Sequence, residues 1–269
     1  MMEGKLEADV RAAKAVEENS VQSLASALTD GADPNSEPTA GIPLLHLACE
    51  KDNPLLVATL LESGAIVNSR GRRAETALHR AARRNFVRVI SILLDHRADL
   101  NLYSEDGDAP LHSAAQNGSV EAARVLLAAG ADPNVKNLND KRTPLHDAAR
   151  CNHASLATLL LDYGAALNEK DTEGTVPLIA AAQGKAGDVL TLLLDRHADP
   201  NLQDKSGRTA LMWAVTKDDN PALVELLMKY GADVNKTDDT GNTAVSRARL
   251  LGHDRVAKLL ERLSSGGNS

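Results

Sequence analysis

The 269-residue sequence contains very few aromatic residues: one Phe, one Trp and three Tyr. A globular core of this size usually packs more aromatic side chains, whereas layers of leucine and alanine do not need them. No apolar run is long enough to span a membrane, and the first residues contain no signal-peptide core. The two cysteines, Cys49 and Cys151, are expected to be free thiols, which favours a reducing compartment. We therefore expect a soluble, monomeric protein of the cytoplasm or nucleus.

The chain also has no excess of positive charge. Its 30 Lys and Arg residues are outnumbered by 37 Asp and Glu, for a net charge of −7. This balance argues against a general attraction to nucleic acids or membrane surfaces. The glycines do not form a phosphate-binding loop with the Lys-Ser/Thr that such a loop requires. We expect a protein that is not an enzyme and has no catalytic, metal-binding or cofactor-binding residues.

What the sequence does contain is a regular period. One apolar series recurs at intervals of 33 or 34 residues: Leu45, Leu78, Leu111, Leu145, Leu178, Leu211 and Val245. A second series has the same period and consists of Asn35, Asn68, Asn101, Asn134, Asn168, Asn201 and Asn235. Two independent series with one period predict a repeat protein.

Each repeat reads as two helices and a turn. Thr143 can cap a helix, and Pro144 suits the first helical position, where no amide donor is needed. Leu145 begins a narrow apolar stripe of leucine and alanine. A second helix with a larger apolar content follows, as at residues 159–161, and Gly164 is expected to end it in the left-handed conformation. The polar segment before the next repeat has room only for a turn or hairpin.

The motif T-P-L-H-x-A-A, followed by L-L and G-A-D-x-N at this period, resembles the ankyrin repeat, and the match covers almost the whole chain. The resemblance implies an all-α fold, a solenoid of stacked helix–loop–helix units with projecting β-hairpin loops. It also implies a concave groove, lined by hairpins and first helices, that binds other proteins.

We expect a single array over residues 1–263, followed by a disordered tail at residues 264–269. The first and last units are atypical and more polar, as terminal caps must be. The predicted units are 1–33, 34–66, 67–99, 100–132, 133–166, 167–199, 200–233 and 234–263.

Two of the expected glycine stops are missing. Arg97 and His197 stand where the other repeats have glycine after the second helix. A residue other than glycine costs on the order of 1 kcal/mol in the left-handed region. We predict that glycine at either position would raise stability.

Several polar positions that recur within the repeats suggest chemistry but have simpler interpretations. The histidines at the repeat period cannot share a metal, because equivalent residues of adjacent helices lie roughly 10 Å apart, whereas zinc ligands lie near 2 Å from one ion. We expect these histidines to hydrogen-bond backbone between repeats; they are His46, His79, His112 and His146. The segment 151–153 (Cys-Asn-His) could suggest thiol catalysis, but neighbouring helical residues point in different directions. The periodic asparagines resemble sites of asparaginyl hydroxylation in the family, and we favour a role in anchoring hairpins.

The third repeat carries a block of arginine. Residues 68–97 contain eight arginines against one Glu and one Asp. Two interpretations remain open. The block is either a solvated face, partly neutralised by the acidic hairpin of the next repeat, or a surface that binds an acidic or carboxylate-bearing peptide, because arginine grips carboxylates with paired hydrogen bonds.

The family pattern, transferred residue by residue, places the candidate partner-binding residues on hairpin tips and first helices. Trp213 is included because tryptophan is enriched among the dominant residues of interfaces, although a lone tryptophan is commonly part of a core. The set is Arg70, Arg72, Arg73, Arg83, Arg84, Tyr103, Glu105, Asp106, Asp108, Gln116, Asn117, Arg142, Arg150 and Trp213.

The predicted function is a non-catalytic protein–protein interaction module that binds a partner protein or peptide in its groove, through acidic residues of the partner. The alternative is a recognition subunit, adaptor or effector of a larger assembly, such as a ubiquitin-ligase or signalling complex. A rigid array supports either function, since little ordering entropy is lost on binding.

Overall fold

The computed structural model describes residues 2–39, 41–217, 219 and 221–265. The chain forms two compact units, residues 1–139 and residues 140–269, which are considered separately. Within the described residues there are sixteen α-helices and no β-strand. The all-α solenoid class predicted from the sequence is confirmed.

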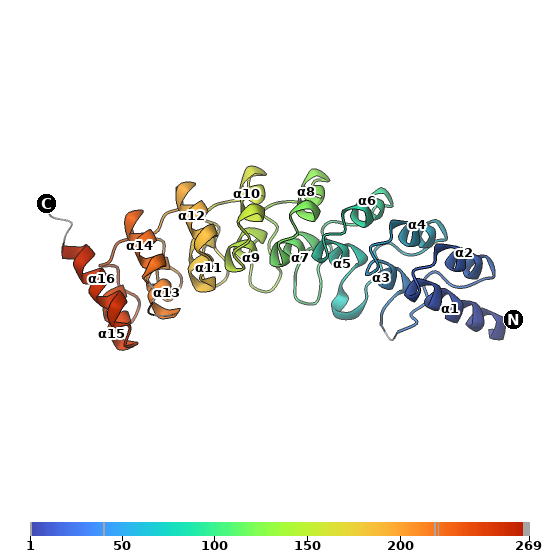
Figure 1. Cartoon of the computed structure of the whole chain (residues 1–269), viewed down its shortest axis with the longest axis horizontal. Helices are drawn as coiled ribbons and strands as arrows, with labels where there is room; N and C mark the ends of the chain where they lie inside the picture. The colour runs from blue at the N-terminus through green and yellow to red at the C-terminus, as the bar shows by residue number, and fades with distance from the viewer. Residues whose placement is uncertain (1, 40, 218, 220, 266–269) are drawn as a thin grey trace. The chain divides into compact units, whose positions relative to one another are not determined.

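In the N-terminal unit the helices form two rows (Figure 1). First helices of the repeats lie in one row and second helices in the other, and the loops that connect successive repeats project beyond the first row. The helices are α1 (Met2–Glu17), α2 (Val21–Thr29), α3 (Leu44–Ala48), α4 (Pro54–Glu62), α5 (Ala77–Arg83), α6 (Val87–Asp95), α7 (Pro110–Asn117) and α8 (Val120–Ala128), with one 3₁₀ turn, η1 (Arg72–Ala74).

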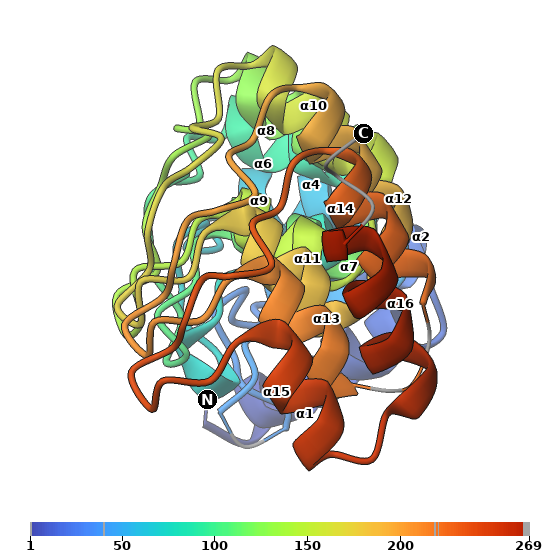
Figure 2. The ribbon, with the colours of Figure 1, turned by 90° about the vertical axis from the view of Figure 1, so that its left-hand side faces the viewer.

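The C-terminal unit repeats this arrangement, and its connecting loops gather along one edge (Figure 2). Its helices are α9 (Pro144–Arg150), α10 (Ala154–Asp162), α11 (Pro177–Gly184), α12 (Gly187–Asp195), α13 (Ala210–Lys217), α14 (Ala222–Lys229), α15 (Ala244–Leu250) and α16 (Asp254–Ser265). α16 continues two residues beyond the boundary drawn at Leu263, and the rest of the predicted tail, residues 266–269, lies outside the described residues.

The periodic leucines form the core between the two helix rows. From Leu45 to Leu211 each is at most 1% exposed, and they are surrounded by buried alanines of the first helices. These small residues allow the first helices to approach closely. The closest approach is at Gly184 of α11, where an added Cβ would overlap the carbonyl oxygen of Arg150 on α9. The close approach explains why this position in α11 has no side chain.

The second helices end in the left-handed conformation, as the sequence predicted. Gly130 and Gly164 have φ of 97° and 88°. Arg97 and His197 adopt the same region, with φ of 64° and 66°. The chain therefore keeps the backbone turn even where glycine is absent, and the side chain bears the steric cost.

Candidate protein-binding face

Backbone hydrogen bonds join neighbouring hairpins inside each compact unit. In the N-terminal unit, Glu105 N–H donates to the Arg73 carbonyl at 2.7 Å and Leu138 N–H to the Gly107 carbonyl at 2.9 Å. The C-terminal unit has three such bonds, from Thr172 to Asp140, from Lys205 to Glu173 and from Asp239 to Ser206. These bonds fix the spacing of the hairpin side chains, so that the candidate residues on them are preorganised.

The arginine-rich hairpin has an unusual backbone. Arg73 and Ala74 have φ of 58° and 52°, and Ala74 stands where the next hairpin has Gly107. Two consecutive left-handed residues without glycine store strain of order 1 kcal/mol each. Strain of this kind tends to collect at functional positions.

Two hairpin arginines bond the next hairpin. The Arg70 guanidinium donates to the Tyr103 carbonyl at 2.8 Å, and Arg73 forms an ion pair with Asp106. Part of the arginine charge is therefore neutralised by the acidic hairpin, as one of the two sequence interpretations expected. Both side chains remain exposed, and each guanidinium has five N–H donors.

A buried carboxylate organises the arginines of α5. Glu75 is 7% exposed, pairs with Arg83, and lies 3.8 Å from Arg80, which also pairs with Glu50. Arg80 is largely covered, but 41% of the Arg83 side chain stays exposed. Arg83 therefore has a fixed position and free donors at the same time.

The remaining two predicted arginines of the third repeat, Arg72 and Arg84, are also exposed. Arg72 lies on the 3₁₀ turn, beside Gly41 of the preceding hairpin. Arg84 is the C-cap of α5, and its side chain makes no hydrogen bond or ion pair with any residue in the described part of the chain. Arg84 is thus the candidate of the third repeat whose charge is least compensated.

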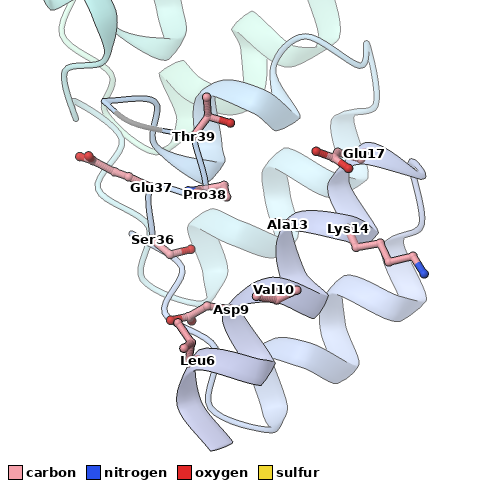
Figure 3. A pocket seen from close by; sticks show the side chains of 10 residues that line it. All are labelled: Leu6, Asp9, Val10, Ala13, Lys14, Glu17, Ser36, Glu37, Pro38 and Thr39. Carbon is pink, nitrogen blue, oxygen red and sulfur yellow. The ribbon is translucent and has the colours of Figure 1, made fainter. Parts of the chain in front are cut away.

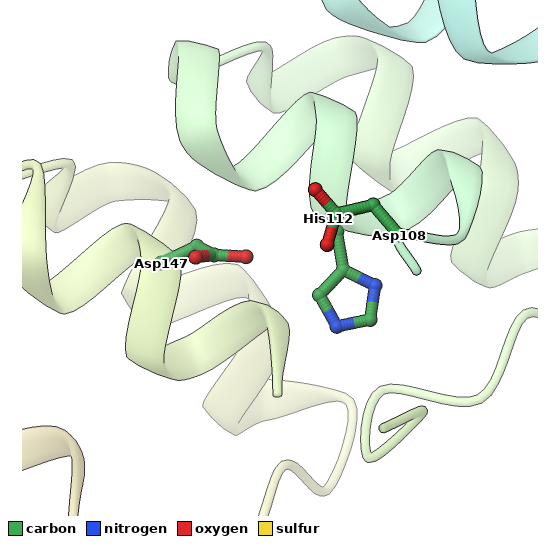
Figure 4. Close-up of side chains that lie close together, drawn as sticks. All are labelled: Asp108, His112 and Asp147. Carbon is green, nitrogen blue, oxygen red and sulfur yellow. The ribbon is translucent and has the colours of Figure 1, made fainter. Parts of the chain in front are cut away.

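Asp108 lies close to His112 (Figure 4) and has a structural role. It lies just before α7, 7% exposed, accepts a hydrogen bond from Gln116 at 2.7 Å and bonds the buried Asn137 of the next hairpin. His112, on the first turn of α7, accepts the N–H of Ala109 at 3.2 Å. Through these contacts Asp108 and Gln116 hold the hairpins in place.

Three other candidates in this unit have more open positions. Glu105 is exposed at the hairpin turn, Tyr103 is half-buried, and the exposed Asn117 donates to the Ser113 carbonyl of its own helix at 2.8 Å. Glu105 is the one carboxylate among these three residues.

Only some candidates of the C-terminal unit have side chains that are free to contact a partner. Arg142 is held by Asp147 at 2.8 Å and by Asp140, so it braces its own hairpin. Arg150 is exposed at the end of α9, and none of its side-chain atoms pairs with a described residue.

Trp213 is half-buried and serves the hairpin of its own repeat. Its indole N–H donates to Asp204 at 2.8 Å, and the Arg208 guanidinium lies 5.0 Å from the ring centroid. Asp204 in turn accepts the N–H groups of Ser206 and Arg208. Arg247 makes the equivalent bond to Asp238 in the next repeat, so in these two repeats this position supplies a donor to the hairpin aspartate.

With this geometry in place, the chain was compared with known proteins. The family description "ankyrin repeats (3 copies)" matches five overlapping stretches: residues 11–102, 45–137, 99–171, 134–204 and 178–266. This chain belongs to the ankyrin repeat family. No curated protein matches it. A similar solved structure is that of the human ASB11 ankyrin repeat domain, with 25% identity, a TM-score of 0.74, and coverage of 85% of this chain and 98% of that one. Ankyrin repeats generally mediate protein–protein interactions.

The histidines of this ankyrin array link repeats, as predicted. His79 Nε2 lies 2.8 Å from the Asp108 carbonyl, and His146 Nε2 lies 2.9 Å from the Thr175 carbonyl. Because a carbonyl only accepts, Nε2 carries the proton, and Nδ1 accepts the N–H of the residue three positions earlier, as from Thr143 at 3.0 Å. Burial lowers the pKa of both histidines and keeps them neutral.

His46 is the exception among them. Pro43 stands where most other repeats have threonine, and it has no N–H, so His46 Nδ1 is buried without a partner among the described residues. Its Nε2 still reaches the Ser69 carbonyl at 3.0 Å. Burial lowers the pKa of His46 to about 4.

The periodic asparagines anchor hairpins, as favoured from the sequence. The Asn35 amide donates to the Gly64 carbonyl at 3.2 Å and accepts the Ile66 N–H at 2.8 Å. Asn201 makes the same pair of bonds with Gly231 and Asp233. Each amide therefore ties the start of its repeat to the end of the second helix of the same repeat.

Both cysteines are free thiols. Burial raises the pKa of Cys49 to about 12 and also raises that of Cys151. A raised pKa disfavours the nucleophilic thiolate, which weakens the thiol-catalysis idea further. Among the described helices, none is both long and apolar enough to cross a bilayer.

Glu75 and Asn137 support the candidate site but were not among the residues predicted from the sequence. Both are polar residues that the fold buries and pairs. The signal for Glu75 was present, since it is the one acid at the centre of the arginine block. Asn137 gave no comparable signal, because its role depends on the neighbouring hairpin.

Proposed function

We propose that the N-terminal unit binds an acidic segment of a partner protein through the arginine surface, defined as Arg83 and Arg84. The observation that carries the proposal is the charge left after internal pairing. Arg70, Arg73 and Arg80 are engaged by neighbouring repeats, whereas Arg84 is unpaired within the described residues and Arg83 is paired but 41% exposed.

The chemistry of these side chains favours carboxylates. Arginine offers paired donors that match a carboxylate, and its charge does not vary over the physiological pH range. Arg83 is held in place by Glu75, so little side-chain entropy is lost when a partner binds.

The test is charge reversal at Arg84 with a matched control. Arg88 belongs to the same repeat and is also exposed and unpaired within the described part of the chain, but it lies on the second helix, α6. Fluorescein-labelled oligoglutamate is titrated into the full chain and into Arg84→Glu and Arg88→Glu, at low and at physiological salt. We expect Arg84→Glu to weaken binding about tenfold and Arg88→Glu to have little effect.

Arg83 is less suitable for reversal, because Arg83→Glu would place a second carboxylate beside the buried Glu75. Equal affinity of the chain and Arg84→Glu for the acidic probe would remove the arginine surface from the proposal.

A second proposal is that the chain is the recognition subunit of a larger assembly. It is favoured by the likeness to the solved ASB11 structure, which is described as one domain of a protein. This chain covers 98% of that domain structure. Light scattering on the protein purified from its native source distinguishes the two. A constant stoichiometric complex supports the assembly, and a bare 28.5 kDa chain contradicts it.

A further inference from the structure

The N-terminal unit contains a second surface feature away from the arginine surface. A pocket of about 720 Å³ lies between α1 and the first hairpin (Figure 3). We call it the α1 pocket and define it by Leu6, Val10, Ala13 and Glu17 of α1 and Ser36 and Glu37 of the hairpin. Its size is within the range of small-molecule and side-chain pockets.

The floor of the α1 pocket is apolar and open. Leu6 and Val10 are 66% and 62% exposed and follow each other by one helical turn, so they form a continuous ridge. Leu24 and many other leucines of this unit are fully buried, and the other exposed aliphatic residues, Leu55, Ile66 and Leu138, stand singly. Two exposed aliphatic side chains one helical turn apart are therefore a departure from the rest of the unit.

The rim of the α1 pocket is acidic. The carboxylates of Glu17 and Glu37 form no ion pair with any residue that the structure describes. The one cation that lines the pocket, Lys14, faces Glu18 at 3.7 Å. The unpaired charge at this rim is therefore negative, opposite to that of the arginine surface.

The hairpin wall also has unused hydrogen-bonding capacity. Ser36 lies on this wall, its side chain directed toward α1 (Figure 3), and its hydroxyl oxygen has no hydrogen-bond partner among the described residues. This oxygen is buried, so the hairpin wall contains one unsatisfied polar atom.

We propose that the α1 pocket binds a short segment of a partner protein in which a bulky aliphatic or aromatic side chain is flanked by Lys or Arg. The apolar side chain covers the Leu6–Val10 ridge, and the flanking cations meet Glu17 and Glu37. The site is separate from the arginine surface and takes a segment of opposite charge, so it extends the proposed function and does not depend on it.

The experiment uses the full chain labelled with ¹⁵N and four peptides of seven residues. Their central three residues are Lys-Leu-Lys, Lys-Ser-Lys, Ser-Leu-Ser and Glu-Leu-Glu, flanked by Gly and Ser; a second set replaces Leu by Trp. We expect the Lys-Leu-Lys or Lys-Trp-Lys peptide to bind with a Kd below about 1 mM and the others about tenfold more weakly. Amide shifts should be confined to residues 6–17 and 36–39.

Matched variants test the two halves of the recognition. Leu6→Ser with Val10→Ser removes the ridge, and Leu55→Ser, at a side chain 64% exposed on α4, is its control. Glu17→Gln with Glu37→Gln removes the charge, and Glu62→Gln on α4 is the control. Each pocket pair should weaken binding at least about tenfold, while the controls do not.

Two results of the peptide titration would overturn the proposal: no amide shift with any basic-apolar peptide up to about 5 mM, or a preference for the Glu-Leu-Glu peptide. A third would be a dimer in sedimentation that Leu6→Ser with Val10→Ser dissociates, because a second copy of the chain would then cover the ridge. Arg84→Glu should leave binding of the basic-apolar peptide unchanged. Failure at the arginine surface and failure at the α1 pocket are therefore distinguishable.

Discussion

Replacing Arg97 or His197 by glycine should stabilise the unit that contains it. Both residues are in the left-handed region, at φ of 64° and 66°. Removing the Cβ there relieves about 1–2 kcal/mol of steric cost, and the greater freedom of glycine in the unfolded chain takes back about 0.5–1 kcal/mol. Both side chains are exposed and make no hydrogen bond or ion pair within the described residues, so no contact is lost. The expected net gain is about 0.5–1 kcal/mol for each.

The chain provides its own reverse controls. Gly130 and Gly231 occupy the equivalent positions in neighbouring repeats, with φ of 97° and 83°, and an added Cβ would meet nothing within 4 Å at either. Gly130→Arg and Gly231→His should therefore destabilise by about the amount that Arg97→Gly and His197→Gly gain. Any loss would come from the backbone and not from a clash.

Urea denaturation followed by circular dichroism measures the midpoint for all four variants, and a thermal scan should shift by roughly 2–4 °C per kcal/mol. Arrays can lose two-state behaviour, so the slopes of the transitions must match before midpoints are compared. If both glycine substitutions leave the midpoint unchanged or lower it while the reverse variants destabilise, the assignment of steric cost to Arg97 and His197 is refuted.

Two further outcomes follow from the packing. Gly184→Ala should destabilise the C-terminal unit by about 1–3 kcal/mol, because its Cβ overlaps the Arg150 carbonyl, whereas Gly187→Ala, with only a side-chain atom at 3.5 Å, should be near neutral in the same urea assay. His46 should stay neutral down to about pH 4. Because its pKa in the folded protein lies below the unfolded value of 6.5, it contributes roughly 3 kcal/mol to the free energy of unfolding above pH 6.5. This contribution declines as the pH falls toward 4. An NMR titration of the His46 ring that gave a pKa near 6.5 would contradict this.

The sequence by itself determined the repeat, the class of fold and the helix ends. Periodic leucines can be buried only if they face the same way in every repeat, and a turn that requires a left-handed residue is visible even where Arg97 or His197 replaces glycine. Histidine at one period likewise predicted bonds between repeats, because each repeat presents the same backbone groups to its neighbour, and the periodic asparagine predicted an anchor for the hairpin.

Only the tertiary structure decided which charges remain available. Arg73, Arg80 and Arg83 look alike in the sequence, but the positions of Asp106, Glu50 and Glu75 relative to them depend on how neighbouring repeats pack. The exposure of Leu6 and Val10 could not be predicted from the sequence either, because an apolar stripe on a helix is expected to lie in the core until its neighbours are known. Periodicity is a property of one repeat, whereas charge compensation and exposure are properties of the contact between repeats.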